Sequence, residues 1–114
     1  MVAWGRAARI ETRGRRSGLW RAAVVGFVEE PDGSLLVAAD EFAQWARNLL
    51  AAPVARVTVG DRTFEVRADV LDGDDRARAV RELVLRYGTP SERLGDGPAF
   101  LLRPEVPAEA AERR

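Results

Sequence analysis

Residues 7–28, with the sequence AARIETRGRRSGLWRAAVVGFV, form the stretch that decides the fold. Apolar and β-branched residues are spread over 7–12 and 20–28, which is typical of strands. Between these segments, Gly14 and Gly18 bracket a short polar run, and glycine permits the positive φ angles that tight turns require. The pattern predicts an antiparallel hairpin whose turn carries positive charge.

The turn itself, Gly14-Arg15-Arg16-Ser17-Gly18, has the donors of an anion-binding site, and Arg13 and Arg21 flank it. Arginine offers a planar fork of N–H donors that matches phosphate or carboxylate oxygens two at a time. The Ser17 hydroxyl and the turn amides would add donors for the same anion. The motif indicates capture of a phosphorylated or polycarboxylated ligand, and a solvated turn rich in arginine is the alternative.

The chain after this hairpin predicts a third strand and a helix. The second strand is expected to continue to residue 30, a turn at 31–34 follows, and the apolar run 35–39 suits a strand buried on both faces, so that three strands form a meander. Asp40 is expected to cap a helix that ends near Ala52, before Pro53. Its expected buried face consists of Phe42, Trp45, Ala46, Leu49 and Leu50.

The second half predicts another hairpin about Gly60-Asp61, with strands at 54–59 and 62–71. A second helix is expected from Asp72 or Asp74 to Gly88, followed by a loop at 89–97 and a last strand at 99–103. The expected buried stripe of this helix consists of Ala77, Val80, Leu83, Val84 and Tyr87.

Six short strands with two interposed helices predict a mainly β, α+β protein whose architecture is a six-stranded antiparallel barrel. The helices do not connect strands at the spacing of a doubly wound sheet, and no Gly-x-Gly-x-x-Gly motif follows a strand. We expect one domain at 1–104 and a flexible C-terminal tail at 105–114.

Composition excludes several kinds of chemistry. The 114 residues contain no cysteine and no histidine, which rules out disulfides, thiol nucleophiles, histidine triads and zinc sites of the usual ligand sets, so no metal site is expected. All 18 basic residues are arginine, which rules out Schiff-base chemistry on lysine. No apolar run reaches a membrane-spanning length and no signal-peptide core is evident, so we expect a cytoplasmic protein without a membrane partner.

Charge is balanced overall but not locally. The formal net charge is zero, whereas residues 6–21 hold six arginines against the single acid Glu11, and residues 29–41 are acidic. A local anion site fits this asymmetry better than a polyanion-binding surface does. A small barrel that binds single-stranded nucleic acid is a weaker alternative, because only Trp4 and Trp20 accompany the basic patch.

The order of these features resembles the deazaflavin (coenzyme F420)-dependent nitroreductase family of actinobacteria. That family belongs to the flavin and deazaflavin oxidoreductases of split β-barrel fold, which are similar to pyridoxamine phosphate oxidase. The resemblance covers roughly residues 10–104 and rests on TRGRRSG at 12–18, LLVAA at 35–39, and WARNLLAAP at 45–53 followed by VTVG at 57–60.

The resemblance implies a binding site for coenzyme F420, with flavin mononucleotide (FMN) as the alternative cofactor. It implies that three residues of the turn hold the cofactor phosphate, that Arg21 approaches the ring or its ribityl chain, and that the main chain of one strand meets the ring edge. Two residues of the first helix would close the ring pocket. The implied cofactor-binding residues are Arg15, Arg16, Ser17, Arg21, Val37, Ala38, Ala39, Trp45 and Asn48. Trp45 is equally expected as a core residue.

The implied activity is hydride transfer from the reduced deazaflavin to an electron-poor small molecule such as a quinone, a nitro compound or an enone. The catalytic residue is unknown; the completing proton could come from water or from Tyr87, the only tyrosine, which is a better candidate for the core. A split-barrel protein that binds a flavin or deazaflavin without turnover is the main alternative.

Two further expectations concern assembly and cofactor preference. Apolar residues on both faces of 20–28 need partners, so we expect a homodimer packed through barrel strands. Arg9 and Arg21 are expected near one rim, where they could meet a carboxylate of the deazaflavin tail and favour that cofactor over FMN.

Overall fold

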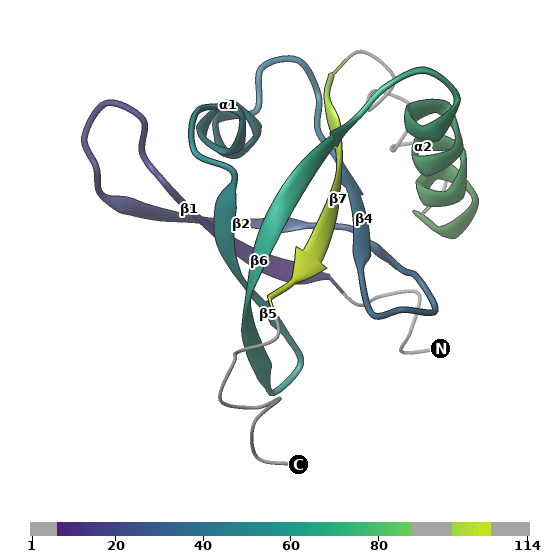
Figure 1. Ribbon diagram of the computed structural model, residues 1–114, viewed down its shortest axis with the longest axis horizontal. Coiled ribbons are helices and arrows are strands. Elements are labelled where there is room, and N and C mark those ends of the chain that lie inside the picture. Colours follow the sequence, from purple (N-terminus) through teal and green to yellow (C-terminus); the bar gives the residue numbers. More distant parts are fainter. Residues whose placement is uncertain (1–6, 88–96, 106–114) are drawn as a thin grey trace.

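The computed structural model describes residues 7–87 and 97–105, which contain seven strands and two helices (Figure 1). Both predicted hairpins, both helices and the last strand are present. The predicted helix end at Gly88, the loop at 89–96 and the tail at 106–114 lie outside the described residues. The elements are β1 (Ala8–Arg13), β2 (Trp20–Val25), β3 (Val28–Glu29), β4 (Leu35–Ala38), α1 (Gln44–Ala51), β5 (Val54–Val59), β6 (Arg62–Leu71), α2 (Gly73–Tyr87) and β7 (Ala99–Pro104).

The strands form one antiparallel sheet in the order β2-β1-β5-β6-β7-β4-β3, with β2 and β3 at opposite edges. Only Gly26 and Phe27 separate these two edge strands in the sequence. Three chain steps span at most about 11 Å, so the edges must adjoin at this point and the sheet must be rolled. Figure 1 shows this curl, with α1 over one end and α2 against the outside. The predicted antiparallel split barrel is therefore confirmed.

The Gly26-Phe27 segment, where the chain crosses from one edge of the sheet to the other, also corrects two predictions. The expected strand at 20–30 is interrupted at Gly26, which gives seven strands where six were expected. The expected three-stranded meander is wrong in its last step, because β4 pairs with β3 and β7 and not with β2. A glycine in a strand pattern is consistent with such a break, since it adds no side chain to the sheet.

Tyr87 holds this crossing in place from the end of α2. Its hydroxyl donates to the carbonyl oxygen of Phe27 and accepts from the Phe27 N–H, both over 3.0 Å. A Cβ atom at Gly26 would lie 2.9 Å from the Tyr87 ring, so the ring can pack there only because the residue is glycine. Gly26 and Tyr87 thus explain both the strand break and the closure of the barrel where β2 meets β3, which we call the seam.

Two hydrophobic clusters stabilise the barrel, and β4 contributes to both. Leu35 and Val37 face the interior cluster, whereas Leu36 and Ala38 pack under α2, which confirms that this strand is buried on both faces. The interior cluster also includes Ile10, Val57, Val66, Phe100 and Leu102 from the other strands and Ala46 and Leu49 from α1. The helix α1 thereby closes one end of the barrel and fixes its own position against β1.

The first helix begins later than predicted. Asp40 does not cap it: its side chain accepts from the Phe42 N–H over 2.8 Å and forms a turn, and the helix starts at Gln44. Phe42 precedes the helix and is 70% exposed, and Leu50 is 52% exposed, so neither belongs to the buried face. The buried residues of α1 are Ala46, Asn48 and Leu49.

The buried stripe of α2 differs from the prediction at Ala77 and Val84. Val84 is half-buried and belongs to neither hydrophobic cluster. Ala79 is buried and Ala77 is exposed, because residues two apart lie on nearly opposite sides of a helix. Val80, Leu83 and Tyr87 pack on the sheet as expected.

Two further observations concern the end of the predicted domain and the ability of the helices to cross a membrane. Glu105, predicted as the first tail residue, donates its N–H to the carbonyl oxygen of Glu65 over 2.9 Å, so the pairing extends one residue past the predicted domain. Within residues 7–87 and 97–105, no helix has both the length and the apolar composition needed to cross a membrane.

Candidate functional site

The hairpin between β1 and β2 presents the predicted cationic turn, with Arg13 opposite Trp20 as its last strand pair. The Gly14 N–H donates to the Leu19 carbonyl over 2.7 Å, and the Gly18 N–H donates to the Gly14 carbonyl over 2.8 Å. Gly18 has a φ of +75°, and a Cβ at Gly14 would lie 2.7 Å from the Ser17 hydroxyl oxygen. The turn therefore favours glycine at 18 by its backbone conformation, as the sequence predicted, and at 14 a side chain would crowd the Ser17 hydroxyl.

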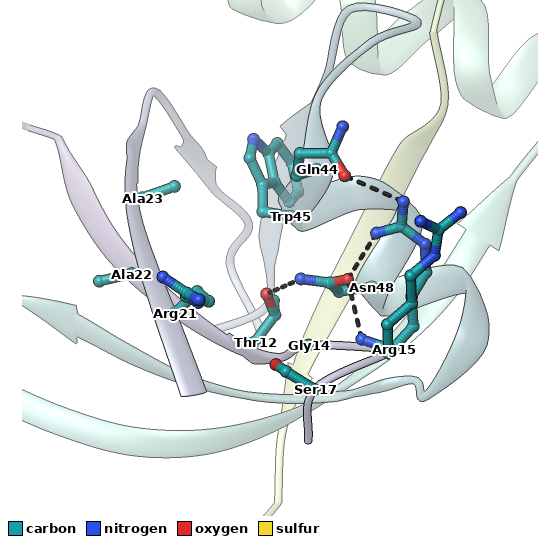
Figure 2. A pocket seen from close by; sticks show the side chains of 11 residues that line it. Thr12, Gly14, Arg15, Ser17, Arg21, Ala22, Ala23, Gln44, Trp45 and Asn48 are labelled. Atoms are coloured by element: carbon teal, nitrogen blue, oxygen red, sulfur yellow. Dashed lines mark hydrogen bonds between the residues drawn. The ribbon is translucent and has the colours of Figure 1, made fainter. Parts of the chain in front are cut away.

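This turn forms one wall of a cleft of about 520 Å³, within the usual range for small-ligand sites. Residues of β1, β2, the turn and α1 meet in it: Thr12, Gly14, Arg15, Arg16, Ser17, Arg21, Ala22, Ala23, Gln44, Trp45 and Asn48. Figure 2 shows Arg21 and Ala23 across the cleft from Asn48 and Arg15, with Trp45 between them. Segments more than twenty residues apart in the sequence thus contribute to one site.

Asn48 connects the helix, the strand and the turn at the centre of this site (Figure 2). Its side-chain oxygen accepts from the Arg15 guanidinium over 2.8 Å and from the Arg15 backbone N–H over 3.3 Å. Its amide nitrogen donates to the Thr12 hydroxyl over 3.2 Å. Gln44, one helical turn earlier, accepts from the other terminal nitrogen of Arg15 over 2.9 Å. The Arg15 side chain is therefore held in one orientation by two neutral amides.

The electrostatics of the cleft favour an anion. Three of its lining residues are arginines and none is acidic. Within the described part of the chain, no hydrogen bond or ion pair engages the guanidinium of Arg16 or of Arg21. The Ser17 hydroxyl oxygen accepts from the Leu19 N–H over 3.1 Å, which leaves the hydroxyl hydrogen for a ligand.

Arg9 corrects one expectation about this site. It was expected beside Arg21, but the register pairs Arg21 with Thr12 and Arg9 with Val24. Paired residues of antiparallel strands share a face and successive residues alternate, so Arg9 lies on the outer face of the sheet. There its guanidinium is 3.2 Å from the Glu11 carboxylate. Arg21 alone of the two belongs to the cleft.

The structure brings together six of the nine predicted cofactor-binding residues: Arg15, Arg16, Ser17, Arg21, Trp45 and Asn48. Trp45 lines the cleft and also packs in the core, where its ring centroid lies 6.0 Å from that of Phe100, so it fits both expectations. Val37, Ala38 and Ala39 are buried and do not line this cleft. Tyr87 does not line it either, because its hydroxyl is bonded to Phe27 at the seam.

Five lining residues were not among the predicted cofactor-binding residues: Thr12, Gly14, Ala22, Ala23 and Gln44. Two of them had a usable signal. Gln44 precedes Asn48 by four residues and must share its helix face. Thr12 lies on the same face of the hairpin as Arg21 once the turn fixes the register.

The residues present fit a phosphate. Arginine side chains and a serine hydroxyl are the donors that phosphate oxygens prefer, and no carboxylate of the cleft would repel them. The half-buried Trp45 and the small side chain of Ala23 leave a flatter, less polar region beside the cations. The site therefore suits a ligand with an anionic group joined to an apolar, planar part.

Comparisons with solved structures agree with the fold. An F420-H2 dependent reductase is 24% identical over 85% of this chain and 93% of its own, with a TM-score of 0.73. The heme storage protein HutZ from Vibrio cholerae is 20% identical over 89% of this chain and 82% of its own, also with a TM-score of 0.73. The protein Atu2129 of unknown function from Agrobacterium tumefaciens is 27% identical over 89% of this chain and 49% of its own, with a TM-score of 0.74.

The comparison with curated proteins gave no match. A family model described as F420H(2)-dependent quinone reductase matches residues 5–93, which include the cationic turn, α1 and every residue that lines the cleft. The cofactor of this family is coenzyme F420. The chain belongs to the F420H(2)-dependent quinone reductase family and is an F420-dependent reductase of split-barrel fold.

Proposed function

We propose that this protein transfers a hydride from reduced coenzyme F420 to a quinone, and that the cleft beside the cationic turn binds the phosphate end of the cofactor. The observation that carries the proposal is the set of three arginines in a cleft without an acidic residue. Quinones are the first substrate class to test, because the family is described by them. Nitro compounds and enones are the next.

The roles of the lining residues follow from their positions. Arg15, Arg16 and the Ser17 hydroxyl hold the phosphate, with Arg15 fixed by α1 before the ligand arrives. Arg21, on the facing strand, bonds the chain between phosphate and ring. Trp45 packs against the planar part and helps to exclude water from it. A site that is ordered in advance loses less entropy on binding.

The main chain of Val37 to Ala39 is proposed to meet the edge of the ring. β3 pairs only with Leu35 and Leu36, so beyond Leu36 the β4 edge opposite β7 has no strand beside it in the described part of the chain. The N–H of Ala39 is not free for this role, since it donates to the Pro98 carbonyl over 2.9 Å. In an antiparallel pair the backbone groups of successive residues point to opposite edges, so those of Val37 face β7 as the Ala39 N–H does. The N–H and carbonyl of Ala38, on the open edge, are the better candidates.

When bound, the reduced deazaflavin supplies a hydride, and a quinone that accepts it takes one further proton to become a hydroquinone. No tyrosine and no carboxylic acid lines the cleft, so we propose water as the source of that proton. The protein residues bind, orient and partly desolvate the reactants.

Cofactor oxidation by menadione tests this proposal. Purified protein should accelerate the reaction between reduced F420 and menadione well above the rate without protein, under anaerobic conditions. Parallel reactions with a nitro compound and with cyclohexenone would rank the substrate classes. Tight binding of F420 without any acceleration would support the alternative, a protein that binds the cofactor without turnover.

Arg21→Ala and Arg9→Ala form a matched pair of variants for the binding site. Both remove one positive charge from the same hairpin, but the first removes it from the cleft and the second from the outer face. We expect only Arg21→Ala to raise the KM for F420. Equal effects of the two variants would show that F420 binding depends on the overall charge of the hairpin and not on this cleft.

We also propose that the protein acts as a homodimer in the cytoplasm. β2 is an edge strand whose outer face exposes Trp20 (52%) and Val24 (76%). An exposed apolar edge of this kind is a template for a second chain. A structural neighbour, 24% identical, is described as a domain-swapped dimer.

A further inference from the structure

The two side-chain amides of the chain accept hydrogen bonds from the same arginine, Arg15. The sequence contains one asparagine, Asn48, and one glutamine, Gln44, against 18 aspartates and glutamates. Both amides accept from the Arg15 guanidinium, over 2.8 and 2.9 Å. Other arginines donate to a carboxylate, as in the pairs Arg78–Glu30 and Arg103–Asp69.

A neutral acceptor and a carboxylate have different consequences for a cation. Either one can orient the guanidinium by a hydrogen bond of similar length. A carboxylate also cancels the positive charge, so that an incoming anion would have to displace it or share the cation with it. An amide fixes the side chain and leaves its unit charge for the ligand.

Burial makes this distinction effective at Asn48. The residue is 4% exposed, and its partner Thr12 is fully buried, so the bond to Arg15 is poorly screened by water on the side of the helix. The two bonds use one hydrogen on each terminal nitrogen of Arg15, and three N–H donors of the guanidinium remain for a ligand.

We infer that Asn48 and Gln44 are positioning residues that orient Arg15 while preserving its charge, and that their neutrality makes the turn an anion site. This inference rests on the proposed function, because it concerns the same cleft. It also assigns Asn48 a role different from the one the family resemblance implied: Asn48 acts on the ligand through Arg15 and does not close the ring pocket itself.

Asn48→Asp is the decisive variant, because it changes the charge and keeps the shape. An aspartate at 48 can still accept from Arg15, and the Thr12 hydroxyl can turn to donate to it, so the fold should be retained. Gln44→Glu makes the same change at the other nitrogen. Ala77→Glu, on an exposed position of α2 outside the cleft, adds the same charge and serves as the control.

The binding of F420, and separately of inorganic pyrophosphate, would be titrated at several salt concentrations, together with thermal unfolding of each unliganded variant. For Asn48→Asp we expect F420 binding to weaken about 10- to 100-fold, the loss of roughly one charge-assisted bond. The salt dependence should become shallower, and the unfolding temperature without ligand should be unchanged or higher. A merely structural role for Asn48 would give the opposite, a lower unfolding temperature with an unchanged salt dependence.

The outcomes separate this inference from the proposed function. If the native protein binds F420 and both acidic variants bind it equally well, the inference is overturned and the proposed function stands. If the native protein binds pyrophosphate but not F420, and Asn48→Asp loses that binding, the inference stands and the cofactor assignment fails. If the native protein binds neither probe, both are overturned.

Discussion

Replacing Tyr87 by phenylalanine should destabilise the barrel without changing catalysis. The substitution removes only the hydroxyl, which makes two hydrogen bonds of 3.0 Å to the backbone of Phe27. The ring remains to pack beside Gly26. Phe27 is 2% exposed, so its N–H and carbonyl lose partners that water cannot fully replace.

The magnitude follows from these two bonds. A hydrogen bond contributes about 0.5–1.5 kcal/mol net, and a buried group left without a partner costs about 1–3 kcal/mol. We therefore expect the free energy of unfolding to fall by about 2–3 kcal/mol. For a domain of this size each kcal/mol lowers the melting temperature by roughly 4–8 °C. Urea unfolding followed by circular dichroism measures the change directly.

Leu85→Ala is the control, since Leu85 lies on the same helix and is 76% exposed; its effect should stay within about 0.5 kcal/mol. A loss below about 0.5 kcal/mol in Tyr87→Phe would refute the argument that this hydroxyl secures the seam. Turnover at a temperature where the variant is folded should match the native enzyme, because Tyr87 does not line the cleft. A large fall in kcat there would instead restore Tyr87 as the proton donor.

Three further predictions concern the site and the assembly. Arg15→Ala combined with Arg16→Ala should weaken F420 binding by about 3–6 kcal/mol, at roughly 1.5–3 kcal/mol for each charge-assisted bond; unchanged affinity in calorimetry would remove the anion site. F420 should bind more tightly than FMN at low salt, because its tail carries further negative charge beside a cleft with three arginines and no acid, and this preference should shrink as salt is raised; equal dissociation constants for the two cofactors at low salt would contradict it. Light scattering should give twice the chain mass of 12.5 kDa at micromolar concentration, and Val24→Lys on β2 should reduce it to that of one chain; a native mass of one chain would contradict the homodimer.

The parts of the fold that could be predicted from the sequence are those decided by near neighbours. Glycine spacing fixes the β1–β2 turn, period-two alternation identifies β6, and the uninterrupted apolar run of β4 identifies a strand covered on both sides. Each depends on residues within about ten positions of one another. The cationic turn was predictable for the same reason, since Arg15 and Arg16 lie between its two glycines.

The parts that could not be predicted depend on distant contacts. The break at Gly26 occurs because the Tyr87 ring occupies the space of a Cβ, and these residues are sixty-one positions apart in the sequence. Nothing near Gly26 distinguishes it from a glycine tolerated inside a strand. Once the break is missed, β3 and β4 are assigned to the wrong edge of the sheet, and the three-stranded meander follows from that one error.

The wrong placement of Arg9 has a different cause, and it shows what the charge pattern of a hairpin can mean. Counted along the chain, six arginines within residues 6–21 suggest one basic patch. The strand register divides them: Arg21 faces the cleft with Thr12, while Arg9 faces outward and is neutralised by Glu11. On the outer face an arginine is paired with an acid, whereas on the inner face Arg15 donates to two neutral amides. The positive charge that a ligand meets is therefore set by the acceptors around the arginines. The number of arginines in the segment does not determine it. Predicting such a site from sequence therefore requires the register first, and then the identity of the acceptors that each face brings to its cations.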